Sequence, residues 1–311
     1  MGVRRLRIGS VPIDVVRFDE ALDAIEALVE RRAGGCVFTP NVDHVVKAER
    51  VPEFRDAYRN VDLSVADGMP LVWASRLLGA PLPERVSGSD LVLPLARRAA
   101  RRGWRIYLLG GTDGDAERAG KLLERLGVAL AGVEAPYVDL GAPGIAANEA
   151  TADRVRASGA DLVLVALGAP KQEIWIHRHR ERLGGTVAIG VGASLAFLAG
   201  RVSRCPRWMA RAGLEWLFRL ACEPRRLWRR YLVEGPAFLP VLLRTWRRRH
   251  SNGAPRVPVT RAPKLTSPTA GFDPLSPQGG ARARSPSGRS PSRVNGARDV
   301  GSAGPHYVDR P

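Results

Sequence analysis

Thr39, Asn41 and Asp67 are polar side chains that follow short apolar segments and precede segments with helical spacing. The apolar segments, residues 36–38 and 63–66, are predicted strands. In open α/β sheets, ligands bind at the carboxyl ends of strands, so these three side chains are candidates for contact with a substrate. A local role is the alternative, because Thr and Asn also cap strand ends and Asp favours turns. Position alone gives the two interpretations equal weight.

Two other reactive side chains, Cys36 and Lys171, are weaker candidates. We expect Cys36 to be a strand residue rather than a nucleophile, because it has no paired base beside it in the sequence. Lys171, in the turn after another predicted strand, is expected to contact either a phosphate or solvent.

Asp113 and Asp115 form an Asp-x-Asp pair, a pattern found in metal-dependent sugar transferases. Both precede a segment with helical spacing, and capping that helix and complementing its dipole already account for them. His177 and His179 lie on a polar helical segment, where we expect surface side chains rather than ligands. The sequence predicts neither a metal site nor a cofactor.

The elements that position these residues alternate along the chain. Predicted strands at residues 36–38, 63–66, 104–109, 161–167 and 187–191 are separated by helical segments up to residue 200. This alternation predicts one α/β domain with a mainly parallel sheet, Rossmann-like and flanked by helices. The almost continuously apolar segment 161–167 indicates a central strand buried on both faces. An additional hairpin is expected within residues 1–16.

A glycine turn follows the strand at residues 104–109. Strand, Gly110-Gly111 and helix is a layout that places backbone N–H groups on a phosphate. The glycine spacing differs from Gly-x-Gly-x-x-Gly, so the dinucleotide fingerprint is absent. This absence counts against a nucleotide-binding oxidoreductase, which is one alternative function for such a sheet.

The net charge of +17 in 311 residues points to a polyanionic partner, and the basic residues gather after residue 200. Residues 201–250 interleave arginines with tryptophans and leucines. Basic amphipathic helices of this kind are typical of interfacial membrane binding, with nucleic-acid binding and a solvated surface as alternatives. Pro224 is predicted to start a helix that ends at Gly235. The exposed apolar face of such an appendage would also allow self-association.

The remaining features delimit the chain. Residues 251–311 are rich in Pro, Gly, Ser and Arg, so we expect a disordered tail after an α/β core at 1–200 and a helical appendage at 201–250. The three cysteines suggest no disulfide framework, which fits a reducing compartment. We expect neither a signal peptide nor a membrane-spanning helix.

The motifs, taken in order, resemble the WecG/TagA/CpsF glycosyltransferases over roughly residues 8–248. Each motif is weakly specific alone, but the ordered set is highly specific. The matching segments are Thr39-Pro40-Asn41, Ala66-Asp67-Gly68-Met69-Pro70, Arg85-Val86-Ser87-Gly88-Ser89-Asp90, Leu109-Gly110-Gly111, Gly168-Ala169-Pro170-Lys171-Gln172-Glu173, Glu215-Trp216-Leu217-Phe218-Arg219-Leu220 and Glu223-Pro224-Arg225-Arg226.

The resemblance implies an inverting, metal-independent enzyme that moves a sugar from a UDP-sugar to a polyprenyl-diphosphate-linked acceptor. Such an enzyme would work on the cytoplasmic face of the membrane, held peripherally against anionic inner-leaflet lipids, with no nucleic-acid partner. In this family the carboxyl-terminal appendage completes the active site. The implied donor is an N-acetylmannosamine-type sugar or a related hexose or uronic acid, and the implied products are teichoic acids or other surface polysaccharides.

The resemblance also implies roles for individual residues. Asp67 becomes the general base, which accepts the proton of the attacking acceptor hydroxyl, a role typically worth about 10²–10⁴-fold in rate. Direct displacement needs one such base and no enzyme nucleophile. The substrate-binding candidates are Thr39, Asn41, Arg85 and Gln172, and the candidates for gripping the lipid diphosphate are Arg219, Arg226 and Arg229. One position departs from the family pattern, because Ala196 stands where an Asp usually precedes Phe197. If that Asp contacts the donor, donor choice or activity differs in this protein.

Overall fold

The computed structural model describes residues 4–112, 114–203, 205–206, 208–209 and 213–251, without the side chain of Arg226. Asp113 and almost all of the predicted tail, from residue 252 onward, lie outside these residues. The boundaries drawn at residues 200 and 250 therefore stay predictions.

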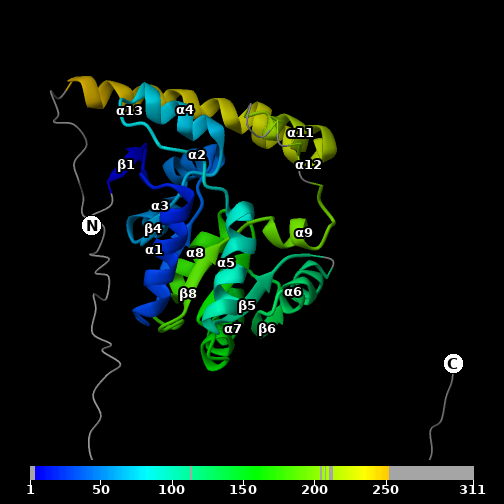
Figure 1. Ribbon diagram of the computed structural model, residues 1–311. Helices are drawn as coiled ribbons and strands as arrows, with labels where there is room; N and C mark the ends of the chain where they lie inside the picture. The colour runs from blue at the N-terminus through cyan, green and yellow to red at the C-terminus, as the bar shows by residue number, and fades with distance from the viewer. Residues whose placement is uncertain (1–3, 113, 204, 207, 210–212, 252–311) are drawn as a thin grey trace, which may run out of the picture. The chain divides into compact units, whose positions relative to one another are not determined.

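A six-stranded parallel sheet forms the centre of the described chain (Figure 1). Its strands are β3 (Gly35–Phe38), β4 (Leu63–Ser64), β5 (Arg105–Gly110), β6 (Ala129–Glu134), β7 (Leu162–Ala166) and β8 (Val187–Gly190). The spatial order is β4-β3-β8-β7-β5-β6. The predicted α/β fold with a parallel sheet is confirmed, and β7 lies inside the sheet between β8 and β5, as its apolar sequence indicated. The sequence analysis missed β6, whose residues are only partly buried.

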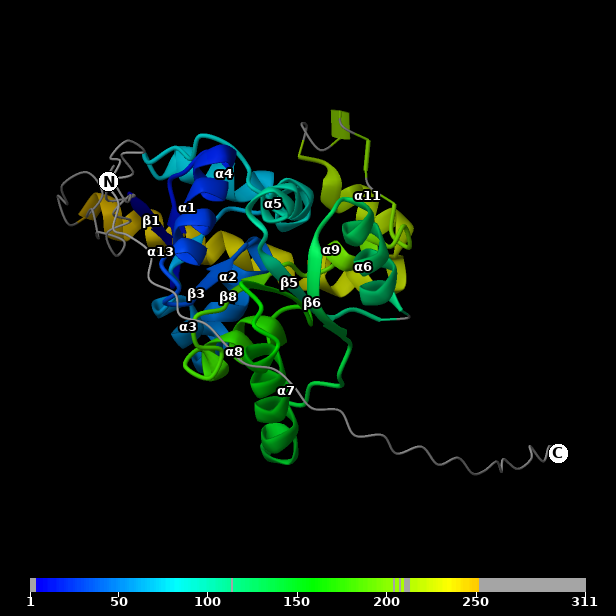
Figure 2. The ribbon, with the colours of Figure 1, turned by 60° about the horizontal axis from the view of Figure 1, so that its bottom comes forward.

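Helices cover both faces of the sheet (Figure 2). One face carries α1 (Phe18–Glu30), α5 (Gly88–Arg102) and α6 (Asp115–Arg125), and the other carries α3 (Pro52–Arg59), α7 (Ile145–Ala157) and α8 (Lys171–His179). Strand side chains alternate between the two cores, so Leu162 and Leu164 join one core while Val163 and Val165 join the other. This double burial explains why the strands are apolar runs rather than alternating patterns.

The expected N-terminal hairpin is present as β1 (Arg5–Ile8) and β2 (Val11–Asp14). Its Asp14 accepts both a hydrogen bond from Arg5 at 2.7 Å and one from the backbone N–H of Ser64 in β4 at 2.8 Å. The hairpin is therefore bonded to β4, and the loop that follows β4 carries Asp67.

The chain after residue 213 forms helices that pack against this edge. They are α11 (Glu215–Cys222), α12 (Pro224–Trp228), a π-helical turn at Arg229–Glu234, a 3₁₀ turn at Gly235–Ala237 and α13 (Phe238–Ser251). Pro224 starts a helix as predicted, but the expected stop at Gly235 is wrong because the π and 3₁₀ turns carry the helical path into α13. Phe238 and Val241 of α13 are buried against the core. Within the described residues, the helices are too short or too polar to span a bilayer.

Candidate active site

Three loops at one sheet edge are joined by backbone hydrogen bonds. The N–H of Asp67 donates to the carbonyl of Pro40 at 2.7 Å, and the N–H of Val86 donates to the carbonyl of Ala66 at 2.9 Å. Each loop leads into a helix: α2 (Val42–Arg50), α4 (Met69–Leu77) and α5, with Asn41, Gly68 and Ser87 at the respective N-caps. Gly68 has a φ of 127°, a conformation that L side chains rarely adopt. Three helix N-termini, each with a partial positive charge, thus converge at this edge.

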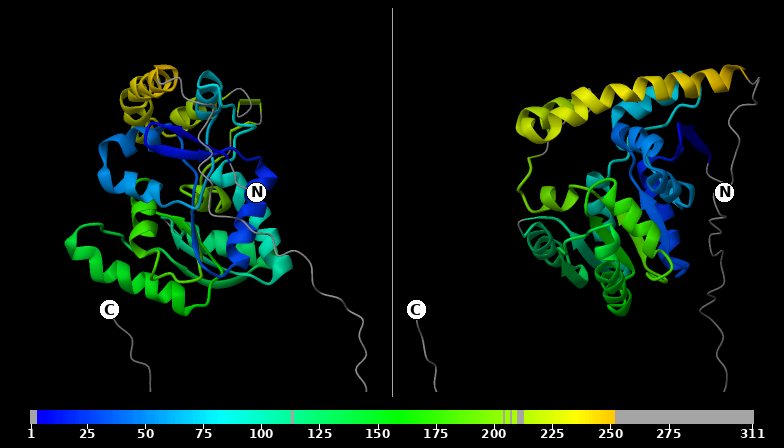
Figure 3. Two further views of the ribbon diagram at one scale, coloured as in Figure 1. Left: turned by 90° about the vertical axis from the view of Figure 1, so that its left-hand side faces the viewer. Right: turned by 180° about the vertical axis from the view of Figure 1, so that it is seen from behind.

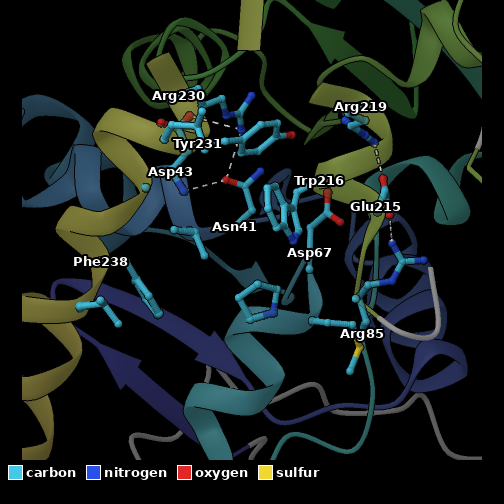
Figure 4. Close-up of a pocket in the computed structure, with 18 residues that line it drawn as sticks. Asn41, Asp43, Asp67, Arg85, Glu215, Trp216, Arg219, Arg230, Tyr231 and Phe238 are labelled. Atoms are coloured by element: carbon cyan, nitrogen blue, oxygen red, sulfur yellow. Dashed lines mark hydrogen bonds and ion pairs between the residues drawn. The ribbon is translucent and has the colours of Figure 1, made fainter. Parts of the chain in front are cut away.

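A cavity of about 340 Å³ lies between these loops and the helices after residue 213 (Figure 4). The core contributes Asn41, Asp67 and Arg85 to its lining. The later helices contribute polar and aromatic side chains, which are Glu215, Trp216, Arg219, Arg230, Tyr231 and Phe238. The cavity therefore combines carboxylates, guanidinium groups and aromatic rings, a composition suited to a sugar that carries phosphates.

Asp67 lies in the wall of this cavity, as a substrate-binding position requires. Burial is the largest influence on its carboxyl group and raises its pKa, and the nearby carboxylate of Glu215 raises it further. Arg219, Arg85 and a hydrogen bond with Ser87 act in the opposite direction without cancelling the shift. A carboxylate with a raised pKa is a stronger base than an ordinary aspartate.

Glu215 connects the core to α11 across the cavity (Figure 4). Its carboxylate accepts a hydrogen bond from Arg85 at 2.8 Å and another from Arg219 at 2.6 Å. The second guanidinium nitrogen of Arg85 binds Asp90 of α5 at 2.7 Å. Arg219 also lies over the ring of Phe197 at 4.9 Å from its centroid. Two arginines are thereby held side by side near Asp67.

Arg230 makes the second polar connection between the late helices and the core. One of its nitrogens lies 3.3 Å from Asn41 Oδ1 and 3.3 Å from the carboxylate of Asp43. Burial would raise the pKa of Asp43, but Arg230 and Lys47 outweigh it and lower the pKa below its ordinary value. Asn41 Oδ1 also accepts hydrogen bonds from the backbone N–H groups of α2, so its side chain orients both the helix and Arg230.

Thr39 and Gln172 lie behind the cavity wall rather than in it. Thr39 Oγ1 donates to the carbonyl of Gly190 at 3.2 Å, and Gln172 Oε1 accepts from the N–H of Gly192 at 3.1 Å. Both side chains are almost fully buried. They tie the end of β3 and the first turn of α8 to the end of β8. Their predicted role as substrate-binding residues stays a prediction.

Comparison with known proteins decides the family. Residues 6–252 match the glycosyl transferase WecG/TagA/CpsF family. The chain belongs to this family. It is also similar to an N-acetylglucosaminyldiphosphoundecaprenol N-acetyl-beta-D-mannosaminyltransferase of Bacillus spizizenii, with 32% identity over 221 residues. The aligned region covers 70% of this chain and 81% of the relative. The protein is therefore a glycosyltransferase, as the ordered motifs predicted, and the oxidoreductase and nucleic-acid hypotheses lose their support.

Of the site residues expected for a WecG/TagA/CpsF glycosyltransferase, the structure places Asn41, Asp67, Arg85 and Arg219 together in the cavity wall. Arg229 is exposed and lies outside that wall. The side chain of Arg226 lies outside the described part of the chain.

Sequence reasoning missed Arg230, Tyr231 and Glu215 as cavity residues. Glu215 stands in one of the family-like motifs, and Arg230 belongs to the arginine-rich segment, so both were visible but unassigned. The sequence did not show which way Arg230 and Tyr231 point, because the π-helical turn at Arg229–Glu234 departs from the ordinary helical period. The direction of Glu215 depends on how α11 packs on the core.

The other candidate residues have structural partners. Burial raises the pKa of the Cys36 thiol to about 12, which agrees with its expected lack of nucleophilic character. Asp115 binds Arg201 through hydrogen bonds as short as 2.6 Å, and these lower its pKa. Lys171 donates to the carbonyl of Val138 at 3.1 Å. The expectation of a surface position is wrong for His179, which is buried against Trp175.

Proposed function

We propose that this glycosyltransferase moves an N-acetylmannosamine-type sugar from a UDP-sugar to a polyprenyl-diphosphate-linked sugar, in one displacement that inverts the anomeric centre. The observation that carries the proposal is the position of Asp67, a carboxylate of raised pKa in the wall of a cavity that also presents Arg85 and Arg219. The activity named for the Bacillus relative supports the choice of sugar and acceptor.

The proposed reaction uses Asp67 as the general base. The acceptor hydroxyl attacks the anomeric carbon while its proton passes to the Asp67 carboxylate. The bond between the anomeric carbon and the phosphate oxygen breaks, and UDP leaves with the electron pair. One carboxylate suffices for this step, because no covalent sugar–enzyme intermediate is formed.

Negative charge develops on the leaving diphosphate, and positive groups of this chain stand ready to stabilise it. Arginine binds phosphate through paired hydrogen bonds, and Arg85, Arg219 and Arg230 all line the cavity. The N-termini of α2, α4 and α5 add partial positive charge at the same edge. These groups support a reaction without a divalent cation, so transfer should persist in excess EDTA.

The acceptor is proposed to enter from the membrane, with the enzyme bound peripherally to the inner leaflet. The helices that close the cavity expose large apolar side chains, among them Trp228, Leu239 and Trp246. Exposed Trp and Leu beside many arginines are characteristic of interfacial helices. This arrangement would bring the cavity next to a diphosphate whose lipid chain stays in the bilayer.

The decisive experiment measures sugar transfer to a short-chain polyprenyl-diphosphate-GlcNAc acceptor, with Asp67→Asn beside the unmodified enzyme. Asn preserves the shape of the side chain but cannot accept the proton, so kcat should fall by about 10²–10⁴-fold. Asp56→Asn is the matched control, because the Asp56 side chain is 47% exposed, pairs with nearby Arg59 and does not line the cavity. Retention of more than a tenth of kcat by Asp67→Asn would remove the general-base assignment.

A further inference from the structure

We propose that α4, a helix of the catalytic core, makes a second contact with anionic membrane lipid, so that the cavity opens between two lipid-binding helices. The inference rests on the proposed function in one respect: it assumes that the helices after residue 213 bind the membrane. It adds a contact in the α/β core, far in sequence from the basic segment that predicted membrane binding.

The exposed face of α4 has the composition of an interfacial helix. Trp73 and Leu77 are 43% and 67% exposed, and Arg76 lies exposed on the same side, at helical spacings of three and four residues. The opposite side of α4 is buried through Leu71, Val72, Ala74 and Ser75. An aromatic, a cation and a large aliphatic side chain together on the exposed side of one helix match the composition of an interfacial helix.

The first turn of α4 borders the cavity, and the helix touches the appendage. Met69 and Pro70 line the cavity wall. Gly213, just before α11, packs so closely on the Trp73 ring that a Cβ there would lie 2.5 Å from a ring carbon. The Trp73 ring therefore adjoins the chain that enters the appendage helices.

α13 presents a similar face on the same side of the core. Leu239, Leu243 and Trp246 are exposed at spacings of four and three residues, while Val241 faces the core. In the views of Figures 1 and 3, α4 and α13 both lie along the edge of the described chain that is farthest from α7. The cavity is lined from both helices, by Met69 on one and by Leu239 on the other.

Charge favours lipid over a second copy of this chain as the occupant. Neither α4 nor α13 contains Asp or Glu, whereas together they carry five arginines, which are Arg76, Arg244, Arg247, Arg248 and Arg249. Two such faces would repel each other, but an anionic leaflet attracts both. The two helices would then rest on one membrane plane, and an acceptor diphosphate at the lipid surface would meet the cavity between them.

The test places an environment-sensitive fluorophore on the full chain at single positions. Cys205 and Cys222 are replaced by Ser, Cys36 is left in the buried β3, and new cysteines are introduced by Leu77→Cys, by Leu243→Cys in α13 and by Ile145→Cys in α7. Ile145 is the matched control, because it is 50% exposed and begins α7, the helix that lies far from α4 and α13 in Figure 1. Vesicles of equimolar phosphatidylcholine and phosphatidylglycerol should shift the emission of labels at 77 and 243 to the blue and leave 145 unchanged.

The outcomes separate this inference from the proposed function. A shift at 243 without a shift at 77 overturns the α4 contact and leaves appendage binding intact. A shift at neither position overturns both membrane contacts, while transfer to a water-soluble acceptor still tests the chemistry. A shift at 77 that grows with protein concentration in the absence of vesicles identifies self-association and overturns the lipid proposal.

A second measurement gives the size of the effect. Leu77→Glu should weaken partition onto the same vesicles by about ten-fold, because it replaces an exposed aliphatic group that the membrane would cover with a charge that the leaflet repels. Ile145→Glu should partition like the unmodified chain. Equal partition of Leu77→Glu and Ile145→Glu would contradict the inference, and circular dichroism would show whether both variants remain folded.

Discussion

Replacing Glu215 by Gln removes one negative charge from the cavity and loosens the connection between α11 and the core. The carboxylate accepts hydrogen bonds from Arg85 at 2.8 Å and from Arg219 at 2.6 Å. A Gln amide can keep only one of them, since its NH₂ group would face a guanidinium. The variant therefore tests whether this bridge closes the cavity and tunes Asp67.

The size of the effect follows from the exposure of the three side chains. Arg85 is 19% exposed, Glu215 27% and Arg219 28%, so the pairs are partly screened by solvent. Hydrogen bonds to charged groups contribute about 1.5–3 kcal/mol when well buried and exposed ion pairs about 0–1 kcal/mol. We expect Glu215→Gln to weaken the packing of α11 against the core by about 1–2 kcal/mol. This free energy corresponds to a loss of roughly 5- to 30-fold in kcat/KM.

The same variant should also shift the pH dependence of kcat/KM, and the direction of the shift can be predicted. Burial is the main cause of the raised pKa of Asp67, Glu215 is the next, and Arg219 and Arg85 oppose both. Without the Glu215 charge the pKa of Asp67 falls. Because the base must be ionised, the acidic limb of the kcat/KM profile should move to lower pH.

The assay is the initial rate of UDP release measured across the acidic limb, and the matched control is Glu49→Gln. Glu49 also joins the core to the late helices, through a 3.6 Å contact with Arg244 in α13, but it does not line the cavity. Glu49→Gln should weaken the packing of the late helices against the core without shifting the acidic limb of the kcat/KM profile. A limb that stays in place or moves to higher pH in Glu215→Gln would refute the electrostatic coupling to Asp67.

Three further predictions concern the cavity and the core. Arg230→Met should lower kcat/KM and unfold at a lower temperature, because it leaves the buried carboxylate of Asp43 with one cationic partner fewer; a melting curve and initial rates measure this. Gly34→Ala should destabilise the fold by about 2–4 kcal/mol in urea, since its φ is 71° and a Cβ would lie 2.2 Å from a backbone oxygen, whereas Gly79→Ala, with φ 67° and open space, should cost about 1 kcal/mol. Cys36 should resist iodoacetamide at about pH 8 in the native protein and react in denaturant, as mass spectrometry of the labelled peptide would show.

The sequence by itself predicted the strands of the sheet other than β6 and the loops at their carboxyl ends. Apolar runs bounded by Gly, Pro and polar residues predict parallel strands wherever both faces are buried, and β7 satisfies this rule in full. Because parallel strands deliver their carboxyl ends to one edge, the placement of Asn41 and Asp67 at a shared site followed from chain order. The ordered motifs then predicted the family.

Only the tertiary structure decided which side chains complete the cavity. The directions of Arg229 and Arg230 depend on the π-helical turn at Arg229–Glu234, which brings Arg230 to Asp43 and leaves Arg229 in solvent. Glu215 and Arg85 are 130 residues apart and meet only through packing. The exposure of the apolar side chains on α4 also could not be predicted. The sequence of a short helix shows which residues share a face, but not whether another element covers that face.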